Sequence, residues 1–296
     1  MAAPEQVRVA AHAKVNLFLR ILAREHSSGH HQIETAFALL ELADELVATR
    51  RGAPGEVTLT VDGPDLGPVE ENLAVRAARA ALAATGNRFG VALALTKRIP
   101  VRAGLGGGSS DAAAALRAVN ALAGNAVPRA ELLQFAAKLG ADVAFFASGA
   151  AAALAWGRGE RLFRLAPLPA APALLAIPPG GGGVATADAY RWWDEMHPEP
   201  AVRGALALDA DALASWGSVG RLGGNDFELP VFGKHPALRA LYERLAATHP
   251  YWVRLCGSGS AVAAVYKSER DRDDAAQQLA SQKQEVIPTM TRRLPG

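Results

Sequence analysis

Pro100-Val-Arg-Ala-Gly-Leu-Gly-Gly-Gly-Ser-Ser-Asp-Ala-Ala-Ala114 is the stretch that decides the fold. Its glycines let the backbone approach a ligand closely, and it runs into a helix predicted over residues 111–122. The free N–H groups and the dipole at the start of a helix attract anions such as phosphate. We expect Ser109 or Ser110 to cap this helix, and Asp111 to be structural because a carboxylate would repel phosphate.

Two common phosphate-binding loops do not fit this stretch. A P-loop NTPase needs Lys and then Ser or Thr after the last glycine, whereas Gly108 is followed by Ser109 and Ser110. The dinucleotide fingerprint G-x-G-x-x-G, with its acidic ribose-binding residue, is not matched either. Alone, a triple glycine is more often a helix cap with a tight turn. Three glycines with two hydroxyl residues exceed what a cap requires, which favours a ligand-binding loop.

Composition narrows the class of protein. The 296 residues carry 31 Lys and Arg against 29 Asp and Glu, with no basic run, so we expect no nucleic-acid partner. One cysteine, Cys256, excludes an intramolecular disulfide and suits the cytoplasm. Arg8, Lys14 and Arg20 interrupt any signal-peptide core, and the apolar residues 143–157 are too short to span a bilayer. We expect no membrane partner.

Alternating apolar residues predict a strand over residues 13–21, with Lys14 and Asn16 on one face. A helix is expected over residues 35–42. The sequence becomes rich in proline and glycine from Trp156 onward, which predicts two domains, at 1–155 and 156–296. The remaining predicted strands are 46–49, 57–61, 91–95, 252–255 and 261–266, and the remaining predicted helices are 72–85, 129–139, 236–247 and 271–282.

The quoted stretch resembles the phosphate-binding motif of the GHMP kinase superfamily, named for galactokinase, homoserine kinase, mevalonate kinase and phosphomevalonate kinase. Other stretches resemble the same family in the same order along most of the chain: residues 13–17, 29–31, 71–78, 139–143, 225–228 and 257–260. The resemblance implies an α+β fold of two lobes, an N-terminal lobe like ribosomal protein S5 domain 2 and a C-terminal ferredoxin-like lobe, with the active site in the cleft between them.

The resemblance also implies a function. The triple-glycine form is similar to the branch that moves the γ-phosphate of ATP to the 2-hydroxyl of a cytidine diphosphate-linked methylerythritol, in the non-mevalonate isoprenoid pathway. ATP and Mg²⁺ are the expected cofactors, with Mg²⁺ held largely by phosphates and water. We expect a monomer or weak homodimer with a small-molecule substrate. A non-catalytic nucleotide-binding or regulatory protein on the same scaffold is the alternative, and the presence of both Lys14 and Asp142 argues against it.

Phosphoryl transfer needs a carboxylate near the attacking hydroxyl and cations near the transferred oxygens. Asp142 lies in an apolar stretch, where an acid is costly without a partner, although a buried aspartate capping a helix would look the same. Lys14 is its expected partner, and a surface lysine extending to solvent is the alternative. In the family that this chain resembles, this lysine and aspartate are catalytic.

The remaining site residues follow from the resemblance. It implies that the ATP phosphates lie at Gly104, Gly106, Gly107, Gly108, Ser109 and Ser110, the adenine near Asn72 and Lys97, and the acceptor at Asn16, His30, His31 and Asp142. His30 stands where the family usually has Tyr, so stacking on cytosine should be less extensive. We expect Tyr190 to supply the opposite stacking face. Ala144, where the family commonly has Pro, should reduce loop rigidity.

Three further features of the sequence have the composition of binding sites. The glycines at 180–183 have no capping Ser or Thr after them and are expected to form a flexible connection. Residues 257–260 join two strands, which alone predicts a tight turn; the resemblance implies packing beside the phosphate loop. Adjacent His30 and His31 point to opposite sides of an extended segment and lack a third ligand, so we expect no protein metal site.

Overall fold

The computed structural model describes residues 3–25, 28–180, 182–198, 206, 208–209, 211–282 and 284–292. Gly181, within the predicted flexible connection, lies outside them. By internal contacts the chain divides into two units: residues 1–13, 42–101 and 106–150 form the first, and residues 14–41, 102–105 and 151–296 the second. Two long strands, β1 (Gln6–Arg24) and β2 (His31–Arg50), contribute residues to both units. The division at residue 155 stays a prediction.

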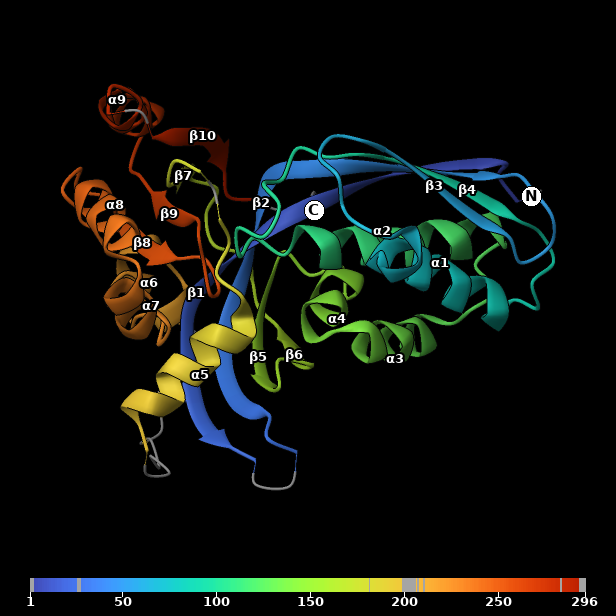
Figure 1. The fold of residues 1–296 in the computed structure, drawn as a ribbon, viewed down its shortest axis with the longest axis horizontal. Helices are drawn as coiled ribbons and strands as arrows, with labels where there is room; N and C mark the ends of the chain where they lie inside the picture. The colour runs from blue at the N-terminus through green and yellow to red at the C-terminus, as the bar shows by residue number, and fades with distance from the viewer. Residues whose placement is uncertain are drawn as a thin grey trace. The chain divides into compact units, whose positions relative to one another are not determined.

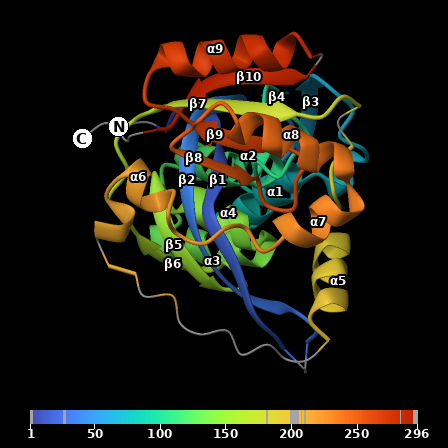
Figure 2. The same cartoon turned by 90° about the vertical axis from the view of Figure 1, so that its left-hand side faces the viewer.

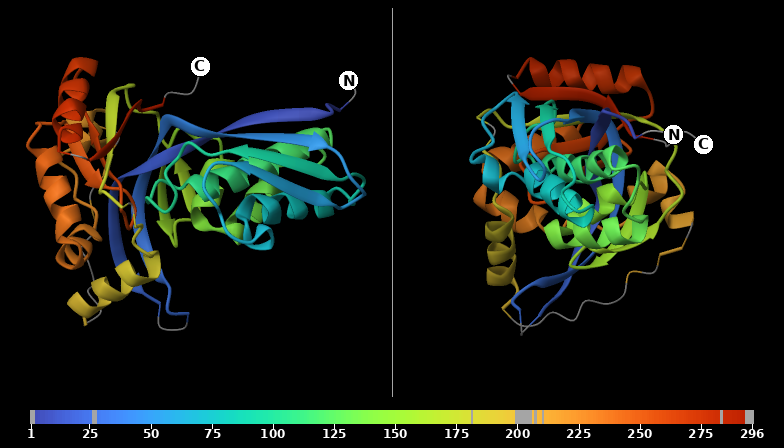
Figure 3. Two further views of the ribbon diagram at one scale, coloured as in Figure 1. Left: turned by 45° about the horizontal axis from the view of Figure 1, so that its top comes forward. Right: turned by 90° about the vertical axis from the view of Figure 1, so that its right-hand side faces the viewer.

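The first unit contains paired strands with helices packed against them. The C-terminal half of β2 is antiparallel to β4 (Val91–Thr96), with Glu45 opposite Thr96, and β4 is parallel to β3 (Val57–Asp62). Figure 1 and Figure 3 show its helices gathered on one side of β3 and β4. These helices are α1 (Leu73–Ala84), α2 (Gly107–Leu122), α3 (Arg129–Leu139) and α4 (Ala141–Ala147), with a short 3₁₀ turn at Val69–Glu71.

Small residues explain how α1 and α2 pack together. The buried face of α1 is built largely from alanines, and residues 112–115 of α2 are four consecutive buried alanines. Side chains of one methyl group let the two helix axes approach closely while still excluding water. The glycine loop that precedes α2 is therefore attached to a tightly packed helix.

The second unit contains two groups of antiparallel strands. The N-terminal half of β2 pairs with β5 (Ala152–Gly157), with Ile33 opposite Gly157, and β5 pairs with β6 (Arg161–Arg164). A separate four-stranded sheet has the order β10-β7-β9-β8, and these strands are Glu285–Met290, Pro172–Ile177, Val262–Val265 and Trp252–Leu255.

Helices cover one face of the four-stranded sheet. Figure 2 shows α8 (Pro236–Ala246) and α9 (Glu269–Ala280) against it. Leu174 and Val262 from the strands share a core with Leu241 of α8 and Leu279 of α9. The other helical segments of this unit are α5 (Thr186–Met196), α6 (Trp216–Val219), α7 (Glu228–Lys234) and a 3₁₀ turn at Asp211–Leu213. No helix in the described part of the chain has the length and apolar character needed to cross a membrane.

Most predicted elements are confirmed, and two expectations are wrong. Residues 35–42 are part of strand β2, not a helix; residues 35–40 are all buried, so their continuous apolar run carries no alternation that would reveal a strand. The N-cap of α2 is Gly106, in the left-handed conformation with φ of 74°, and Ser109 and Ser110 lie inside the first helical turn. A glycine adopts this conformation without steric cost.

Candidate active site

The glycine loop ends in the first turn of α2. Among the described residues no side chain caps this helix, and its first N–H groups have no partner four residues earlier within the helix, which is the arrangement that binds anions. Gly108 is exposed, and a β-carbon there would meet no atom within 4 Å among the described residues. Packing therefore gives no reason for glycine at 108, whereas close approach of a ligand to the backbone does. Ser109 is half-buried and Ser110 is buried in this turn.

Lys97 lies beside this turn in a buried ionic cluster, which we call the Lys97 cluster (Asp44, Lys97 and Asp111). Its ammonium donates to Oδ2 of Asp111 at 2.7 Å and to Oδ2 of Asp44. The other oxygen of Asp44 accepts the backbone N–H groups of Arg98 at 2.6 Å and Ile99 at 2.8 Å. Burial raises the pKa of Asp111 to about 7, although the nearby Lys97 ammonium opposes this. The ammonium predicted to lie near adenine is thus held by two carboxylates.

Asn72 and Asp142 also belong to the first unit. Asn72 is the N-cap of α1, and its side chain accepts the N–H of Ala74 at 2.9 Å, which gives it a structural role in addition to the one expected at adenine. Asp142 lies in the first turn of α4 and is half-buried, followed by the buried Val143 and Phe145. An acid at this end of a helix is favoured by the helix dipole.

Lys14 and Asn16 lie on β1 in the second unit, on one face as predicted. Lys14 is buried, so the alternative of a surface lysine is wrong. Its ammonium donates to Oδ1 of Asn16 at 2.8 Å, and the amide nitrogen of Asn16 donates to Oγ1 of Thr35 at 2.9 Å. The same ammonium lies 5.3 Å from the ring centre of Phe37. A buried cation is costly, and this polar chain fixes its direction.

The loop between β8 and β9 packs on the first residues of the glycine loop, as expected. A β-carbon on Gly104, whose φ is 80°, would stand 1.8 Å from the carbonyl oxygen of Cys256, so only glycine fits there. Ala261 donates its N–H to the carbonyl of Ala103 at 3.1 Å. The amide nitrogen of Asn225 donates to the carbonyl of Gly257 at 2.6 Å. This contact gives a structural role to the segment 225–228, one of the stretches that resemble the family. Burial raises the pKa of the Cys256 thiol to about 12.

His31 and Tyr190 come together in the second unit. Their rings are stacked with centroids 4.2 Å apart, and Tyr190 also meets Phe227 edge to face at 4.9 Å. Nε2 of His31 lies 2.7 Å from Oδ1 of Asp194, whose other oxygen is 3.3 Å from Arg24. His31 is buried, while Tyr190 and Asp194 on α5 are half-buried. The start of β2 and helix α5 are therefore joined by both stacking and polar contacts.

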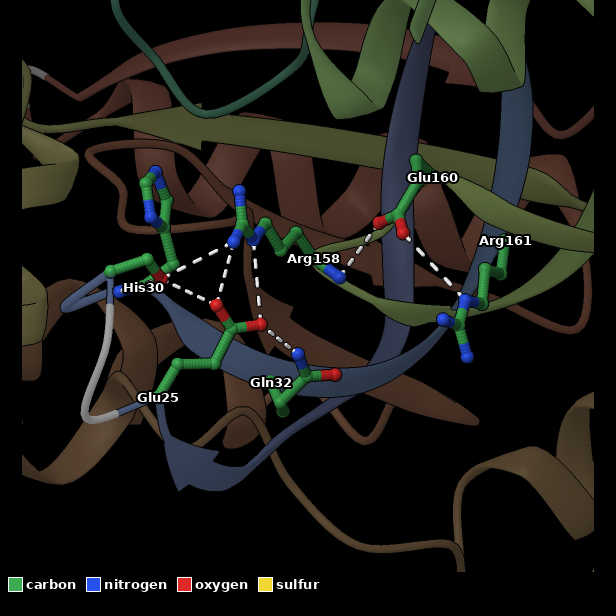
Figure 4. A network of polar contacts seen from close by, with 7 residues as sticks. Glu25, His30, Gln32, Arg158, Glu160 and Arg161 are labelled. Atoms are coloured by element: carbon green, nitrogen blue, oxygen red, sulfur yellow. Dashed lines mark hydrogen bonds and ion pairs between the residues drawn. The ribbon is translucent and has the colours of Figure 1, made fainter.

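His30 is exposed, and the turn that carries it is held by a network drawn in Figure 4. Arg158 donates to a carboxylate oxygen of Glu25 at 2.6 Å and to Oγ of Ser28 at 3.2 Å. The backbone N–H of His30 donates to the same Ser28 oxygen at 3.2 Å, and Gln32 donates to Glu25. The hydrogen bond from Arg158 is the main cause that lowers the pKa of Glu25 to about 2.

Sequence reasoning missed Asp44, Asp194 and Arg158, each of which supports an expected site residue. Asp44 lies in the middle of β2, where a buried acid in an apolar strand could have indicated a partner. No sequence signal joins Asp194 to His31 or Arg158 to Glu25, because these pairs are separated by 163 and 133 residues. The pairing of Lys14 with Asp142, which belong to different units, stays a prediction.

Comparisons with known proteins identify the same family in both halves of the chain. The model of the GHMP kinases N-terminal domain matches residues 72–155, and that of the GHMP kinases C-terminal domain matches residues 207–285. A 4-diphosphocytidyl-2-C-methyl-D-erythritol kinase of Solibacter usitatus is 38% identical over 281 residues, covering 92% of this chain and 84% of that one. The enzyme of the same name from Deinococcus radiodurans is 40% identical over 251 residues, covering 84% and 81%.

Solved structures point to the same family. A crystal structure of 4-(cytidine 5'-diphospho)-2C-methyl-D-erythritol kinase superposes with a TM-score of 0.80 at 36% identity, covering 97% of this chain and all of that one. A crystal structure of mevalonate kinase from L. major shares the fold, with a TM-score of 0.70 at 14% identity. The superposition covers 100% of this chain and 99% of the mevalonate kinase chain.

Proposed function

The chain belongs to the 4-diphosphocytidyl-2-C-methyl-D-erythritol kinases of the GHMP kinase family, and from this we propose how its residues perform that reaction. It transfers the γ-phosphoryl group of ATP to the 2-hydroxyl of 4-diphosphocytidyl-2-C-methyl-D-erythritol, an isoprenoid precursor. The observation that carries the assignment is 38–40% identity to kinases of this name over most of both chains. We further propose a cytoplasmic monomer or weak homodimer.

The glycine loop suits the phosphates of ATP. The uncapped first turn of α2 offers N–H donors, and the open space around Gly108 allows the phosphates to approach the backbone. We propose that Gly106, Gly107, Gly108, Ser109 and Ser110 surround them, with Gly104 shaping the loop, and that Asn72 and Lys97 border the adenine. Mg²⁺ bound with ATP would neutralise phosphate charge and be held largely by the phosphates and water.

Lys14 and Asp142 are the proposed catalytic residues. Asp142 orients the 2-hydroxyl and accepts its proton late, because an ordinary carboxylate is too weak a base to ionise an alcohol beforehand. As the bond from the hydroxyl oxygen to the γ-phosphorus forms, the bond from that phosphorus to the β,γ-bridging oxygen breaks, and ADP leaves. Lys14, directed by Asn16, stabilises the charge that develops on the transferred group.

The acceptor is proposed to lie against Asn16, His30, His31 and Tyr190. The half-buried ring of Tyr190 is stacked on the buried His31 and can in turn stack on a pyrimidine, and Asp194 holds the imidazole in place. Incubation with ATP and the acceptor, followed by ³¹P NMR, tests the reaction. We expect a new phosphomonoester signal together with ADP. ADP with inorganic phosphate alone would mean hydrolysis and would refute the assignment, as would nucleotide binding without turnover, which would support the non-catalytic alternative.

A further inference from the structure

The Lys97 cluster contains one more acid than base. Its ammonium and both carboxylates are almost completely enclosed: the side chains of Lys97, Asp44 and Asp111 have exposures of 4%, 0% and 4%. If both acids were ionised, a net negative charge would be buried beside the phosphate loop. A buried charge without a partner is strongly disfavoured, so such a site tends to retain a proton.

Asp111 is the member that can hold this proton. Both oxygens of Asp44 accept hydrogen bonds, one from Lys97 and the other from the N–H groups of Arg98 and Ile99. In Asp111, Oδ2 accepts from Lys97, whereas Oδ1 is buried and finds no hydrogen-bond partner among the described residues. Burial outweighs the attraction of Lys97 and raises the pKa of Asp111 to about 7.

The strongest charges that act on Asp111 come from the cluster itself. They are Lys97, which follows β4, and Asp44 on β2. The helices α1, α3 and α4 also pack against α2, and the residues that they bury are all apolar. The balance within the cluster therefore decides whether Asp111 carries a charge.

The cluster touches the backbone that opens α2. The ammonium of Lys97 lies 3.4 Å from where a β-carbon of Gly107 would stand, and Asp111 is four residues further along the same helix. An anion at the first turn is attracted by the helix N–H groups and repelled by a negative charge at Asp111. If the charge on Asp111 weakens anion binding, then anion binding must make Asp111 hold its proton more tightly, because such coupling is reciprocal.

We infer that Asp111 is a positioning residue whose proton is linked to nucleotide binding: the loop binds phosphate best when Asp111 is neutral, and binding takes up a proton there. The inference rests on the proposed function, namely that this loop binds the phosphates of a nucleotide. It predicts that nucleotide affinity falls as the pH rises through 7, since Asp111 ionises in that range.

The same proton makes stability depend on pH. Between about pH 4 and pH 7 the folded state holds a proton that an unfolded aspartate has already released, since the pKa is raised from 3.8 to about 7. The unfolded state binds fewer protons in this window, so the contribution of Asp111 to stability falls as the pH rises. Above both pKa values, the contribution of Asp111 to stability no longer changes with pH.

Isothermal titration calorimetry with ADP and Mg²⁺ tests the linkage, with Asp111→Asn as the variant because asparagine resembles the neutral acid. Titrations at pH 7 in two buffers of different ionisation enthalpy give the protons taken up per ADP. Protonation of the nucleotide itself is the same for both proteins and cancels. We expect the unmodified chain to take up several tenths of a proton more than the variant, and its affinity relative to the variant to fall several-fold from pH 6 to pH 8.

Equal proton uptake in the two proteins would overturn the inference while leaving the proposed function intact. Absence of ADP binding by the unmodified chain would overturn both. If Asp111→Asn does not fold, ¹³C NMR of the aspartate carboxyl carbons in the unmodified chain decides the question. We expect the assigned Asp111 signal to titrate near pH 7 and to move to higher pH with ADP. Titration near pH 4, or no movement with ADP, would contradict the inference.

Discussion

The imidazole ring of His31 and the phenol ring of Tyr190 lie 4.2 Å apart between centroids, with an angle of 11° between their planes. One ring stands at the start of β2 and the other on α5, separated by more than 150 positions in the sequence. The two residues expected at the acceptor therefore form a single aromatic unit, and Asp194 fixes the imidazole from its edge. In the proposed acceptor site, the surface that the pyrimidine would meet depends on both rings.

Replacement of Tyr190 by alanine should weaken acceptor binding. A lost aromatic contact of about 0.5–1.5 kcal/mol corresponds to a rise of roughly 3- to 10-fold in the acceptor KM. The KM for ATP should not change, and Tyr190→Phe should retain most of the affinity because the ring is kept. Tyr251→Ala, at an exposed tyrosine of the same unit, is the matched control. An unchanged acceptor KM in Tyr190→Ala would remove Tyr190 from the acceptor site.

Arg158→Ala should loosen the turn that carries His30. Without its guanidinium, Glu25 and Ser28 lose the donor that ties them to the β5–β6 turn. We expect a several-fold higher acceptor KM with little change in kcat or in the KM for ATP, measured by steady-state kinetics. Arg161→Ala is the control, since Arg161 forms an ion pair with the neighbouring Glu160 at 3.8 Å, as Figure 4 shows. An equal effect of both substitutions would show that general loss of surface charge is the cause.

Glycines 108 and 104 should respond in opposite ways to alanine. At Gly108, inside α2 with open space around it, alanine should raise the free energy of unfolding by about 0.5–1 kcal/mol, because it restricts the unfolded chain. The same methyl group should weaken ATP binding, since it stands where the phosphates approach. Gly104→Ala should lower stability because its methyl group would collide with Cys256. Denaturant unfolding and ATP titration measure both effects, and unchanged ATP affinity in Gly108→Ala would argue against phosphate at this turn.

Substitutions of the catalytic pair should separate chemistry from binding. Asp142→Asn should abolish turnover and leave the Kd for ATP nearly unchanged, since the carboxylate is proposed to act on the acceptor hydroxyl. Lys14→Met should lower kcat by a factor on the order of 10²–10³, as expected when a group that stabilises developing charge is lost. Thermal unfolding checks that both variants fold. Turnover by Asp142→Asn near that of the unmodified chain would exclude Asp142 as the catalytic carboxylate.

The sequence alone predicted those elements whose local pattern is unambiguous. The helix over residues 129–139 has a glycine directly after it, and the strand that carries Lys14 and Asn16 shows clear alternation. Residues 35–42 have the pattern of a helix in the sequence because residues 35–40 of the strand are buried on both faces, and burial on both faces removes the period of two. Only tertiary contacts distinguish a helix from a strand that is buried on both faces.

The candidate site was predictable as a set of residues but not as a set of contacts. The family resemblance predicts Lys97 and His31 as site residues. It does not predict that Asp44 accepts from the Lys97 ammonium or that Asp194 holds the His31 imidazole. Such pairs join residues 53 and 163 positions apart, and their geometry depends on how whole strands and helices pack. The charge state of Asp111 likewise follows from burial, which no local pattern records.

A coupled assay of ADP release with a panel of acceptors tests the central claim most directly. With ATP and Mg²⁺ present, we predict turnover with 4-diphosphocytidyl-2-C-methyl-D-erythritol and none above background with homoserine, mevalonate or galactose. Turnover with one of those three acceptors, and none with the cytidine-bearing substrate, would contradict the account and assign the chain to another GHMP kinase activity.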